Sequence, residues 1–418
     1  MPLVSEIVGR DAELASLHAF VDGDDAAALV LEGEAGIGKS TLWLAAVEYA
    51  RAEGLQVLSS RPSEPERGLT YVGLGDLFDP IIDEVLPELP PPRRRALEVA
   101  LLRGGAMDDP VTSRTVAVAV RDALELLSER RPTLVAVDDV QWLDPASSRA
   151  LAFALRRLGS SAVTVLLAKR LSDETRQSEL EQALGVDRVQ RVAVGPLSVG
   201  ALHRFLRDRL GAPFPRQTLL RIHERSGGNP FFALELARVL PADVVPETLD
   251  ELVRARLEAL PVRTQKALAV AAAVGTASES LLEQAGASAD SLEPAFAARV
   301  IERDGSLIRF THPLLSSVLY GSLGHDRLRI HARIAEIADD PIVRARHLAL
   351  ATDVPDADVA RLLDEAAMLA EERGAGAITS ELTEQALRLT PAELRDERHA
   401  RALAAARAHL AAGEWTRA

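Results

Sequence analysis

The sequence predicts an α/β region followed by an all-helical region. Five short runs of apolar residues occur within the first 196 residues, and helical segments separate them. The runs are apolar throughout instead of alternating, as expected for parallel strands that are covered on both faces. After Pro196 this strand signal stops and helical patterns follow. The expected strands cover residues 28–32, 55–60, 134–137, 163–168 and, with a weaker pattern, 189–194.

Composition restricts the class of protein. A chain of 418 residues is long enough for about two to four domains. Hydrophobic residues make up 47% and charged residues 26%, which is typical of globular proteins, while the low aromatic content of 4% favours helix packed on helix. The absence of cysteine excludes disulfides and thiolate metal sites. A net charge of −14 argues against broad nucleic-acid binding, which needs a basic face.

The sequence pattern shows neither a secretory signal peptide nor a membrane span. The first residues lack the basic-then-apolar layout of a secretory signal peptide. No stretch of about 18 uncharged apolar residues occurs, so no membrane span is expected. We therefore expect a soluble, cytoplasmic, multidomain protein that makes no membrane contact.

The second half of the sequence is predicted to be helical. The pattern is helical from residue 197 to about 275, where it is broken at residues 226–230, and a short hairpin is expected at residues 303–310. From about residue 326 onward, small residues at the packing positions and short turns indicate stacked helical hairpins of the tetratricopeptide kind. Residues 412–418 resemble a turn and the first residues of another helix, so the array is expected to break off there. One apolar face is formed by Val359, Leu362, Leu363, Ala366 and Ala370, and another by Leu382, Ala386 and Leu389.

A proline-rich region at residues 80–110 is predicted to be a surface excursion. It contains three successive arginines, Arg93, Arg94 and Arg95. These could bind an anion, but the start of a solvated helix is the favoured interpretation.

The strongest chemical signal is a glycine-rich segment between the first strand and a helix. It matches the P-loop pattern G-x-x-x-x-G-K-[ST] in the strand–loop–helix context that this pattern requires. Successive backbone N–H groups and the helix N-terminus can hold phosphate oxygens there. Lys39 is expected to reach the β- and γ-phosphates, and Ser40 to hold Mg²⁺. The predicted nucleotide-binding residues are Gly33, Glu34, Ala35, Gly36, Ile37, Gly38, Lys39, Ser40 and Thr41. The parallel sheet is therefore predicted to be that of a P-loop NTPase that binds ATP or ADP.

A second signal is the pair of acids that follows the third strand. Because ligands of open α/β folds bind at the carboxyl ends of the strands, Asp138 and Asp139 should face the nucleotide. Asp138 can coordinate Mg²⁺, usually through water, and Asp139 can orient or deprotonate the attacking water. A polar loop start is the alternative interpretation.

A third, weaker signal lies at the end of the next strand. Arg170 could contact the γ-phosphate from the neighbouring strand end, although a solvated charge after a strand would give the same pattern. Histidine clusters for a metal, nucleophile triads and paired glycosidase-like carboxylates do not stand out among the nine histidines and the acidic residues.

Four motifs in a fixed order carry a resemblance to a known family. They lie at residues 7–14, 137–144, 226–236 and 310–315, with the P-loop between the first two. In this order they resemble the ATPase core of the STAND class, the signal-transduction ATPases with numerous domains. The chain looks most like the large ATP-binding LuxR-type regulators of actinobacteria, relatives of the maltose-regulon activator. The resemblance extends over residues 4–418.

The resemblance implies a domain order and further nucleotide contacts. It implies an ATPase domain at 1–196, a helical lid at 197–260, a winged-helix domain at 261–325 and tetratricopeptide-like helices at 326–418. Val8 and Arg10 would lie beside the adenine and ribose, Pro230 would press on the adenine, and His312 would approach the β-phosphate. The alternatives are a helix cap for Arg10, a helix break for Pro230 and a satisfied core position for His312. Trp142 is expected to pack and not to stack on the base.

The chain also departs from this family. LuxR-type members end in a DNA-binding helix-turn-helix, and no such segment follows the helices here. We therefore expect a fragment or a truncated relative that does not itself bind DNA. No arginine is identified that would act in trans on a neighbour's nucleotide, which argues against a ring-forming motor.

The function implied by the resemblance is a regulatory switch with slow ATP hydrolysis. ADP would hold the three parts around the nucleotide together. Exchange for ATP, with an inducer or partner protein bound at the C-terminal helices, would release them and allow an ATP-dependent oligomer to form. Two alternatives stay open: an ATPase motor or loader of the AAA+ kind, and an interaction scaffold in which nucleotide is only structural.

Overall fold

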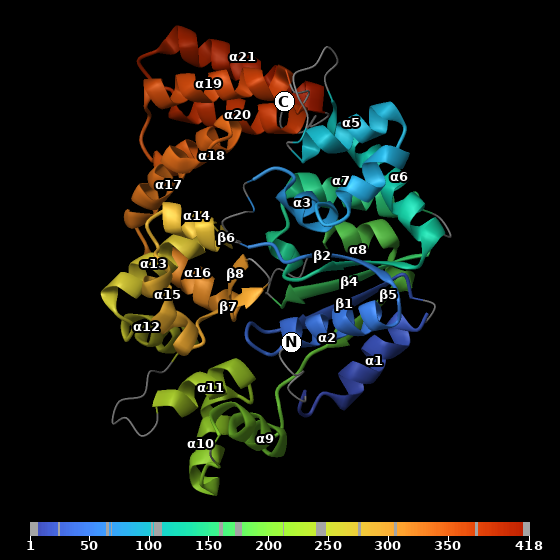
Figure 1. The fold of residues 1–418 in the computed structure, drawn as a ribbon, viewed down its shortest axis with the longest axis vertical. Coiled ribbons are helices and arrows are strands. Elements are labelled where there is room, and N and C mark those ends of the chain that lie inside the picture. Colours follow the sequence, from blue (N-terminus) through green and yellow to red (C-terminus); the bar gives the residue numbers. More distant parts are fainter. Residues whose placement is uncertain are drawn as a thin grey trace.

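The protein is described by a computed structural model (Figure 1). It describes residues 7–23, 26–63, 67, 69–101, 103, 111–158, 162–171, 178–211, 213–239, 248–274, 277–304, 307–372 and 375–412. In this part of the chain a five-stranded parallel sheet has the strand order β2-β3-β4-β1-β5. The strands are β1 (Ala28–Gly33), β2 (Gln56–Ser60), β3 (Thr133–Val137), β4 (Val163–Arg170) and β5 (Val189–Ala193). All five expected strands are thus confirmed.

Both faces of this sheet are buried, which explains the uninterrupted apolar runs. Leu29 and Leu31 of β1 face one apolar cluster, and Ala28 and Val30 face another. The first cluster contains α1 (Asp11–Val21) and α2 (Lys39–Ala52). The second contains α6 (Ser113–Arg130), α7 (Pro145–Leu155) and α8 (Glu179–Leu184). Because side chains alternate between the two faces of a strand, each face needs its own helical layer.

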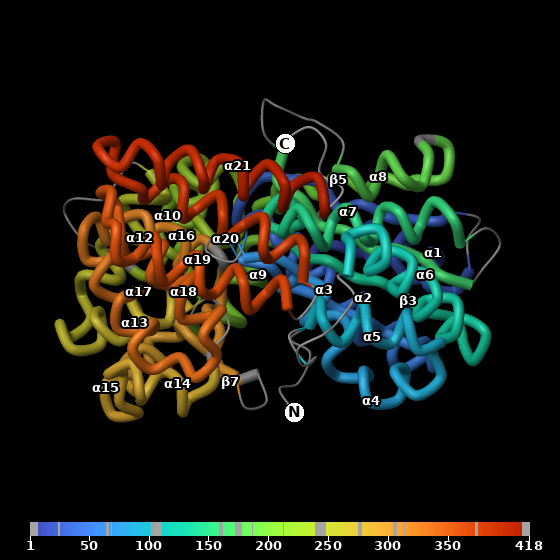
Figure 2. Tube along the Cα trace, turned by 90° about the horizontal axis from the view of Figure 1, so that it is seen from above, coloured from blue at the N-terminus to red at the C-terminus, as the bar shows by residue number. Residues whose placement is uncertain are grey.

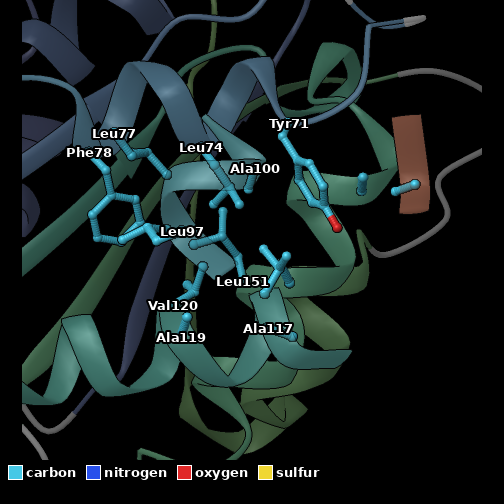
Figure 3. Close-up of a cluster of buried hydrophobic side chains, with 14 of the residues drawn as sticks. Tyr71, Leu74, Leu77, Phe78, Leu97, Ala100, Ala117, Ala119, Val120 and Leu151 are labelled. Atoms are coloured by element: carbon cyan, nitrogen blue, oxygen red, sulfur yellow. The ribbon is translucent and has the colours of Figure 1, made fainter. Parts of the chain in front are cut away.

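The region expected to be a surface excursion is part of the core, so that prediction is wrong. That region contains α4 (Ile82–Val85), η2 (Leu86–Glu88) and α5 (Pro91–Ala100), and α3 (Val72–Phe78) precedes it. Their buried residues belong to the same apolar cluster as α6. Figure 3 shows Leu74 and Phe78 of α3 gathered with Leu97 of α5 and Val120 of α6. Prolines at the starts of helices are compatible with this packing, because the first helical position needs no N–H donor. Residues 104–110 lie outside the described residues.

The arginines of this region fasten it to its surroundings. Arg93 forms an ion pair with Asp122 of α6 at 3.2 Å. Arg94 donates to the carbonyl oxygens of Leu86 and Pro87 at 2.7 and 2.8 Å. These contacts are structural, and they fit the helix-start interpretation of the arginine run better than anion binding.

Two helical groups follow the sheet. The first contains α9 (Val199–Leu210), α10 (Arg216–Ser226) and α11 (Pro230–Val239), which share a small apolar cluster and are called the lid below. The second surrounds an antiparallel sheet of order β6-β8-β7 and is called the small-sheet unit. Its strands are β6 (Ala277–Ser278), β7 (Ile301–Asp304) and β8 (Leu307–Phe310). Its helices are α12 (Leu249–Glu258), α13 (Val262–Val274), α14 (Glu279–Gln284), α15 (Ala289–Ala297) and α16 (Pro313–Ser322). The expected hairpin is confirmed; β6 was not expected.

The remaining described residues form five consecutive helices, here called the helical array. They are α17 (Asp326–Ile337), α18 (Pro341–Ala351), α19 (Ala357–Glu372), α20 (Gly376–Leu389) and α21 (Arg395–Ala412). Leu363 is buried as expected, whereas Leu362 is 38% exposed, so the apolar face of α19 runs through Ala360 instead. Residues 413–418, where the array was expected to break off, lie outside the described residues.

The array folds back onto the α/β part of the molecule (Figures 1 and 2). Residues of α18, α19 and α20 belong to the same apolar cluster as α3, α5 and α6. Glu381 of α20 accepts hydrogen bonds from the backbone N–H and the hydroxyl of Thr70, and Gly376 N–H donates to the Val111 carbonyl at 3.3 Å. The array therefore touches the α/β part directly. Among the described residues, no helix combines the length and apolar character needed to cross a bilayer.

Candidate functional site

The predicted P-loop lies between a buried strand and a helix. β1 ends at Gly33 and α2 begins at Lys39. Gly36 and Gly38 have φ values of 80° and 106°, which L side chains rarely adopt, so glycine is needed at both positions. The loop thereby turns its backbone toward the start of α2, where helix N–H groups have no partner within the helix. This geometry is suited to binding phosphate.

Lys39 is held against the loop that it follows. Its ammonium group donates to the carbonyl oxygens of Gly33 and Glu34, at 2.9 and 2.8 Å. Only 5% of the residue is exposed. Burial lowers the pKa of Lys39; Asp139 raises it and Arg170 lowers it further. A cation that is partly desolvated and bound only to neutral carbonyls is available to a phosphate.

The two predicted acids lie at the end of β3 and differ in role. Asp138 is 2% exposed and accepts a hydrogen bond from the Ser40 side chain. Burial, followed by the neighbouring Asp139, raises the pKa of Asp138. Asp139 has φ 46°, a left-handed conformation that turns its carboxylate toward Gln141 (2.7 Å) and Arg170 (3.5 Å). The structure thus brings Ser40 and Asp138, the two predicted metal-binding residues, into contact.

Arg170 ends β4, the strand between β3 and the P-loop strand. Its Cα lies opposite that of Gly33 in the β1–β4 register. The guanidinium lies 3.5 Å from the Asp139 carboxylate and 5.9 Å from the ring centre of Trp142. Trp142 is half-buried and packs beside this arginine. Arg170 therefore lies at the same edge of the sheet as the P-loop and lines the same cavity.

A second arginine at this edge was missed from the sequence. Arg61 follows β2, the next strand beyond β3, and its Nε lies 3.6 Å from the Asp138 carboxylate. The only signal available was its position directly after an expected strand, the same signal that singled out Arg170.

The lid is attached directly to the P-loop. Asn229 donates from its side-chain amide to the Ala35 carbonyl at 2.9 Å, and the Phe231 N–H donates to the Gly36 carbonyl at 3.3 Å. A Cβ on Gly36 would lie 3.0 Å from the Phe231 Cβ. Pro230 is buried between these two contacts, at the first position of α11. The motif at residues 226–236 was visible in the sequence, but the contacts of Asn229 and Phe231 were not.

His312 of the small-sheet unit completes the enclosure. Its ring stacks on Phe231 with 4.1 Å between ring centres, and its Nδ1 accepts from the Leu314 N–H at 3.1 Å. Burial, and then the charge of Arg170, lower the pKa of His312 to about 3. The imidazole is therefore neutral at pH 7, and with Nδ1 accepting, its proton is on Nε2, where it can be donated. His312 also caps α16, so part of its role is structural.

The N-terminal motif joins the lid to the P-loop from the other side. Arg10 is 5% exposed and donates to the Ile37 carbonyl at 2.9 Å and to Glu13 at 2.8 Å. It precedes α1 but makes no side-chain cap to it. Val8 packs against the apolar cluster of the lid, and a Cβ on Gly9 would lie 2.5 Å from Ala201 of α9. Arg10 thus contacts the loop, and Val8 contacts the lid.

These parts enclose a cavity of about 660 Å³, within the usual range of about 300–1,000 Å³ for small-molecule sites. The α/β part contributes Lys39, Ser40, Thr41, Arg61, Asp139 and Arg170. The lid contributes Phe231 and Glu235, and the small-sheet unit contributes Arg256 and His312. Lysine and arginine side chains from the α/β part and from the small-sheet unit make the cavity suitable for a polyanion such as a nucleotide phosphate chain.

The oxygen donors also fit Mg²⁺. The described residues contain no group of three or more His, Cys, Asp or Glu side chains placed for a metal. Mg²⁺ usually takes one or two protein oxygens and completes its shell with water and substrate phosphate, so Ser40 and Asp138 would be sufficient.

Comparisons with known proteins agree with this geometry. Residues 6–167 match the AAA ATPase domain family. Among curated proteins, an uncharacterized protein of Rhizobium meliloti (strain 1021) is 24% identical over 392 residues, covering 78% of this chain and 36% of that protein. The chain therefore spans well under half the length of this relative.

Solved structures that match the chain include the following two. A Signal Transduction ATPase with Numerous Domains (STAND) protein with a tetratricopeptide repeat sensor, from Pyrococcus horikoshii, has a TM-score of 0.54 and 15% identity, covering 99% of this chain and 63% of that one. A Walker-type ATPase of Pyrococcus abyssi has a TM-score of 0.38 and 18% identity, covering 75% of this chain and 96% of that one. The family match and the site geometry together establish a P-loop ATPase domain in the first part of the chain.

Proposed function

We propose that the chain is a nucleotide-controlled switch, a STAND-type ATPase of a LuxR-type transcriptional regulator. The observation that carries the proposal is the enclosure of the P-loop by three separate parts of the chain. Asn229 of the lid bonds to the loop, and His312 of the small-sheet unit stacks on the adjoining Phe231. A ligand at the P-loop would therefore touch all three parts at once. In such a design the identity of the bound nucleotide can bias how the parts pack.

The proposed contacts combine the side-chain positions around the cavity with the contacts that the resemblance implies. The P-loop N–H groups and Lys39 bind the phosphates, and Arg170 contacts the γ-phosphate. Val8, Arg10 and Pro230 contact the base and ribose, and neutral His312 donates from Nε2 toward the β-phosphate. Ser40 and Asp138 hold Mg²⁺, which when bound neutralises phosphate charge. Asp139, held by Gln141 and Arg170, orients the attacking water and accepts its proton.

The proposed cycle is slow and regulatory. In this proposal the small-sheet unit is a winged-helix domain and the helical array is of the tetratricopeptide kind. ADP holds the α/β part, the lid, the small-sheet unit and the helical array in the closed arrangement. ATP, together with an inducer or partner protein at the array, favours an open form that oligomerises, and hydrolysis restores the closed one. A ligand with equal affinity for the closed and open forms would not shift the equilibrium between them, so ADP must bind the closed form more tightly. In this proposal the chain itself does not bind DNA.

The experiment compares wild-type protein with Lys39→Ala and a matched control, Lys266→Ala, whose side chain is exposed on α13. Nucleotide that co-purifies is identified by mass spectrometry after denaturation, and hydrodynamic radius is measured with ADP, with a non-hydrolysable ATP analogue and with neither. We expect co-purified ADP and a larger radius with the analogue for wild type and Lys266→Ala. Lys39→Ala should show neither co-purified ADP nor a larger radius with the analogue, because its affinity for the phosphates falls by more than about tenfold. Identical radii for wild type in all three conditions would refute the switch.

A further inference from the structure

Arg61 occupies a defined place in a row of charged residues along the sheet edge. Outward from the P-loop strand β1, the row contains Arg170 at the end of β4, Asp138 and Asp139 after β3, and Arg61 after β2. The register fixes the last step, because Ser60 lies opposite Val137 and the Asp138 N–H donates to the Ser60 carbonyl at 3.0 Å. Arg61 therefore lies directly beside Asp138, on the side away from the P-loop.

The Arg61 side chain faces the cavity as well as Asp138. It is a cavity-lining residue together with Lys39, Asp139 and His312. Its side chain is 18% exposed, whereas that of Asp138 is 3% exposed, so the guanidinium is only partly engaged by the carboxylate. Its charge also reaches the opposite wall, because Arg61 contributes to the lowered pKa of His312. Arg61 thus lies within electrostatic reach of both the Asp138 carboxylate and His312.

The donor geometry of Arg61 leaves room for a further anion. Lys39, Arg61 and Arg170 line this end of the cavity with Asp139, and the carboxylates of Asp138 and Asp76 lie next to Arg61. The 3.6 Å separation between Arg61 and Asp138 is too long for a good hydrogen bond. The five N–H donors of the guanidinium can therefore bind two more acceptors in the cavity. A phosphoryl group offers such paired oxygens.

We propose that Arg61 contacts the terminal phosphate of a bound nucleoside triphosphate from the β2 side and so discriminates triphosphate from diphosphate. The inference rests on the proposed function, since it needs nucleotide at the P-loop. Lys39 and the loop hold the inner phosphates, and each further phosphate extends outward along the row of strand ends. Arg170 and Arg61 then flank the outermost phosphate from β4 and β2. A diphosphate is one phosphate shorter and does not reach Arg61.

A purely structural role for Arg61 would give a different result. Its backbone N–H bonds to Asp76 of α3, and its guanidinium partly neutralises Asp138. If neutralising Asp138 were its only role, removing the side chain would act on the Mg²⁺ site and affect ATP and ADP equally. Measuring affinities both with Mg²⁺ and with EDTA separates the two roles, because direct contact with phosphate needs no metal.

The experiment measures the affinity of the 418-residue chain for a non-hydrolysable ATP analogue and for ADP by titration calorimetry. The variants are Arg61→Ala, Arg61→Lys and the control Arg361→Ala, which removes an exposed arginine of α19. We expect Arg61→Ala to lower the affinity for the analogue by about tenfold or more and the affinity for ADP by less than about twofold. The same result is expected with Mg²⁺ and with EDTA. Arg61→Lys should recover part of the loss, and Arg361→Ala should match wild type.

The outcomes distinguish this inference from the function on which it rests. Equal weakening of both nucleotides by Arg61→Ala, a selective loss that disappears in EDTA, or no change at all would each overturn the contact. Thermal melting of the nucleotide-free variants confirms that they fold. If wild-type protein binds neither nucleotide, the proposed function itself fails, independently of Arg61.

Discussion

The side-chain amide of Asn229 donates a hydrogen bond of 2.9 Å to the backbone carbonyl of Ala35, across 194 positions of the sequence. Asn229 is the only asparagine in the chain. The side-chain oxygen of Asn229 accepts a hydrogen bond of 3.2 Å from the Phe232 N–H and so supports the start of α11. One residue therefore fixes the start of the lid helix and ties it to the phosphate-binding loop.

Substituting Asn229 should weaken nucleotide binding through the lid. Asn229→Asp keeps the oxygen that caps Phe232 but loses the amide donor and adds a negative charge facing the Ala35 carbonyl. Asn229→Ala loses both bonds. Since one such bond contributes about 1 kcal/mol, we expect ADP affinity to fall at least about fivefold in each variant, measured by calorimetry. If Asn229→Asp binds ADP as tightly as wild type, the lid does not support the loop through this bond.

Two adjacent glycines before the lid helix offer a matched comparison. Gly227 and Gly228 both have positive φ, 58° and 75°. A Cβ on Gly227 would meet nothing within 4 Å, whereas one on Gly228 would lie 2.6 Å from the Leu197 carbonyl oxygen. Gly227→Ala should therefore lower the free energy of unfolding by only about 1 kcal/mol, because alanine disfavours the left-handed conformation. Gly228→Ala should cost several times as much, because a backbone oxygen cannot move aside easily.

Chemical denaturation of the two glycine variants checks this expectation. The midpoint should shift slightly for Gly227→Ala and clearly for Gly228→Ala, and the second variant should also lose ADP affinity because the lid is displaced. Equal shifts would mean that the close approach of Gly228 to Leu197 does not constrain the lid.

The contact between the array and the α/β part depends on a buried ion pair. Arg346 of α18 is 6% exposed and pairs with Glu381 at 2.7 Å, and Glu381 also accepts from Thr70. Glu381→Ala would leave the arginine charge buried without its partner, which costs about 3 kcal/mol. We expect faster amide hydrogen exchange in α18, α20 and residues around Thr70. Glu365→Ala, at an exposed pair on α19, should leave exchange unchanged.

Much of the fold could be predicted from the sequence because its signals are local. The parallel strands show as apolar runs, and the P-loop shows because left-handed backbone at Gly36 and Gly38 requires glycine. The described part of residues 80–110 was mispredicted because α4, η2 and α5 are short and prolines occur in and beside them, so no long periodic face is visible. Their burial comes from packing onto α6, which a local pattern does not encode.

The candidate site was predictable only where chemistry and spacing coincide. Asp138 and Arg170 each follow a strand, and the fold places strand ends together. Arg61 carries the same signal, but its contact with Asp138 depends on β2 pairing with β3, which the spacing does not fix. The bond between Thr70 and Glu381 spans 311 positions and has no sequence signal.

Two buried histidines should make stability depend on pH. Nδ1 of His331 lies 3.1 Å from Nδ1 of His347, and the Tyr320 hydroxyl lies 2.9 Å from the His331 Nε2. Burial lowers the pKa of both rings to about 4. His347 and then Arg327 lower the pKa of His331 further, and Arg346 lowers that of His347 further. In the unfolded chain a histidine titrates near about 6.5. Between these values the unfolded chain binds more protons than the folded one.

A lowered folded-state pKa means that this contribution to the free energy of unfolding is complete above about pH 6.5 and is lost as pH falls toward 4. We expect urea denaturation to show a clear decrease in stability from pH 7.5 to 5. The double variant His331→Gln/His347→Gln should show a shallower decrease, because glutamine does not titrate. The control His325→Gln, at an exposed position, should keep the wild-type slope. A double variant with the wild-type slope would show that the pair does not stay neutral in the folded protein.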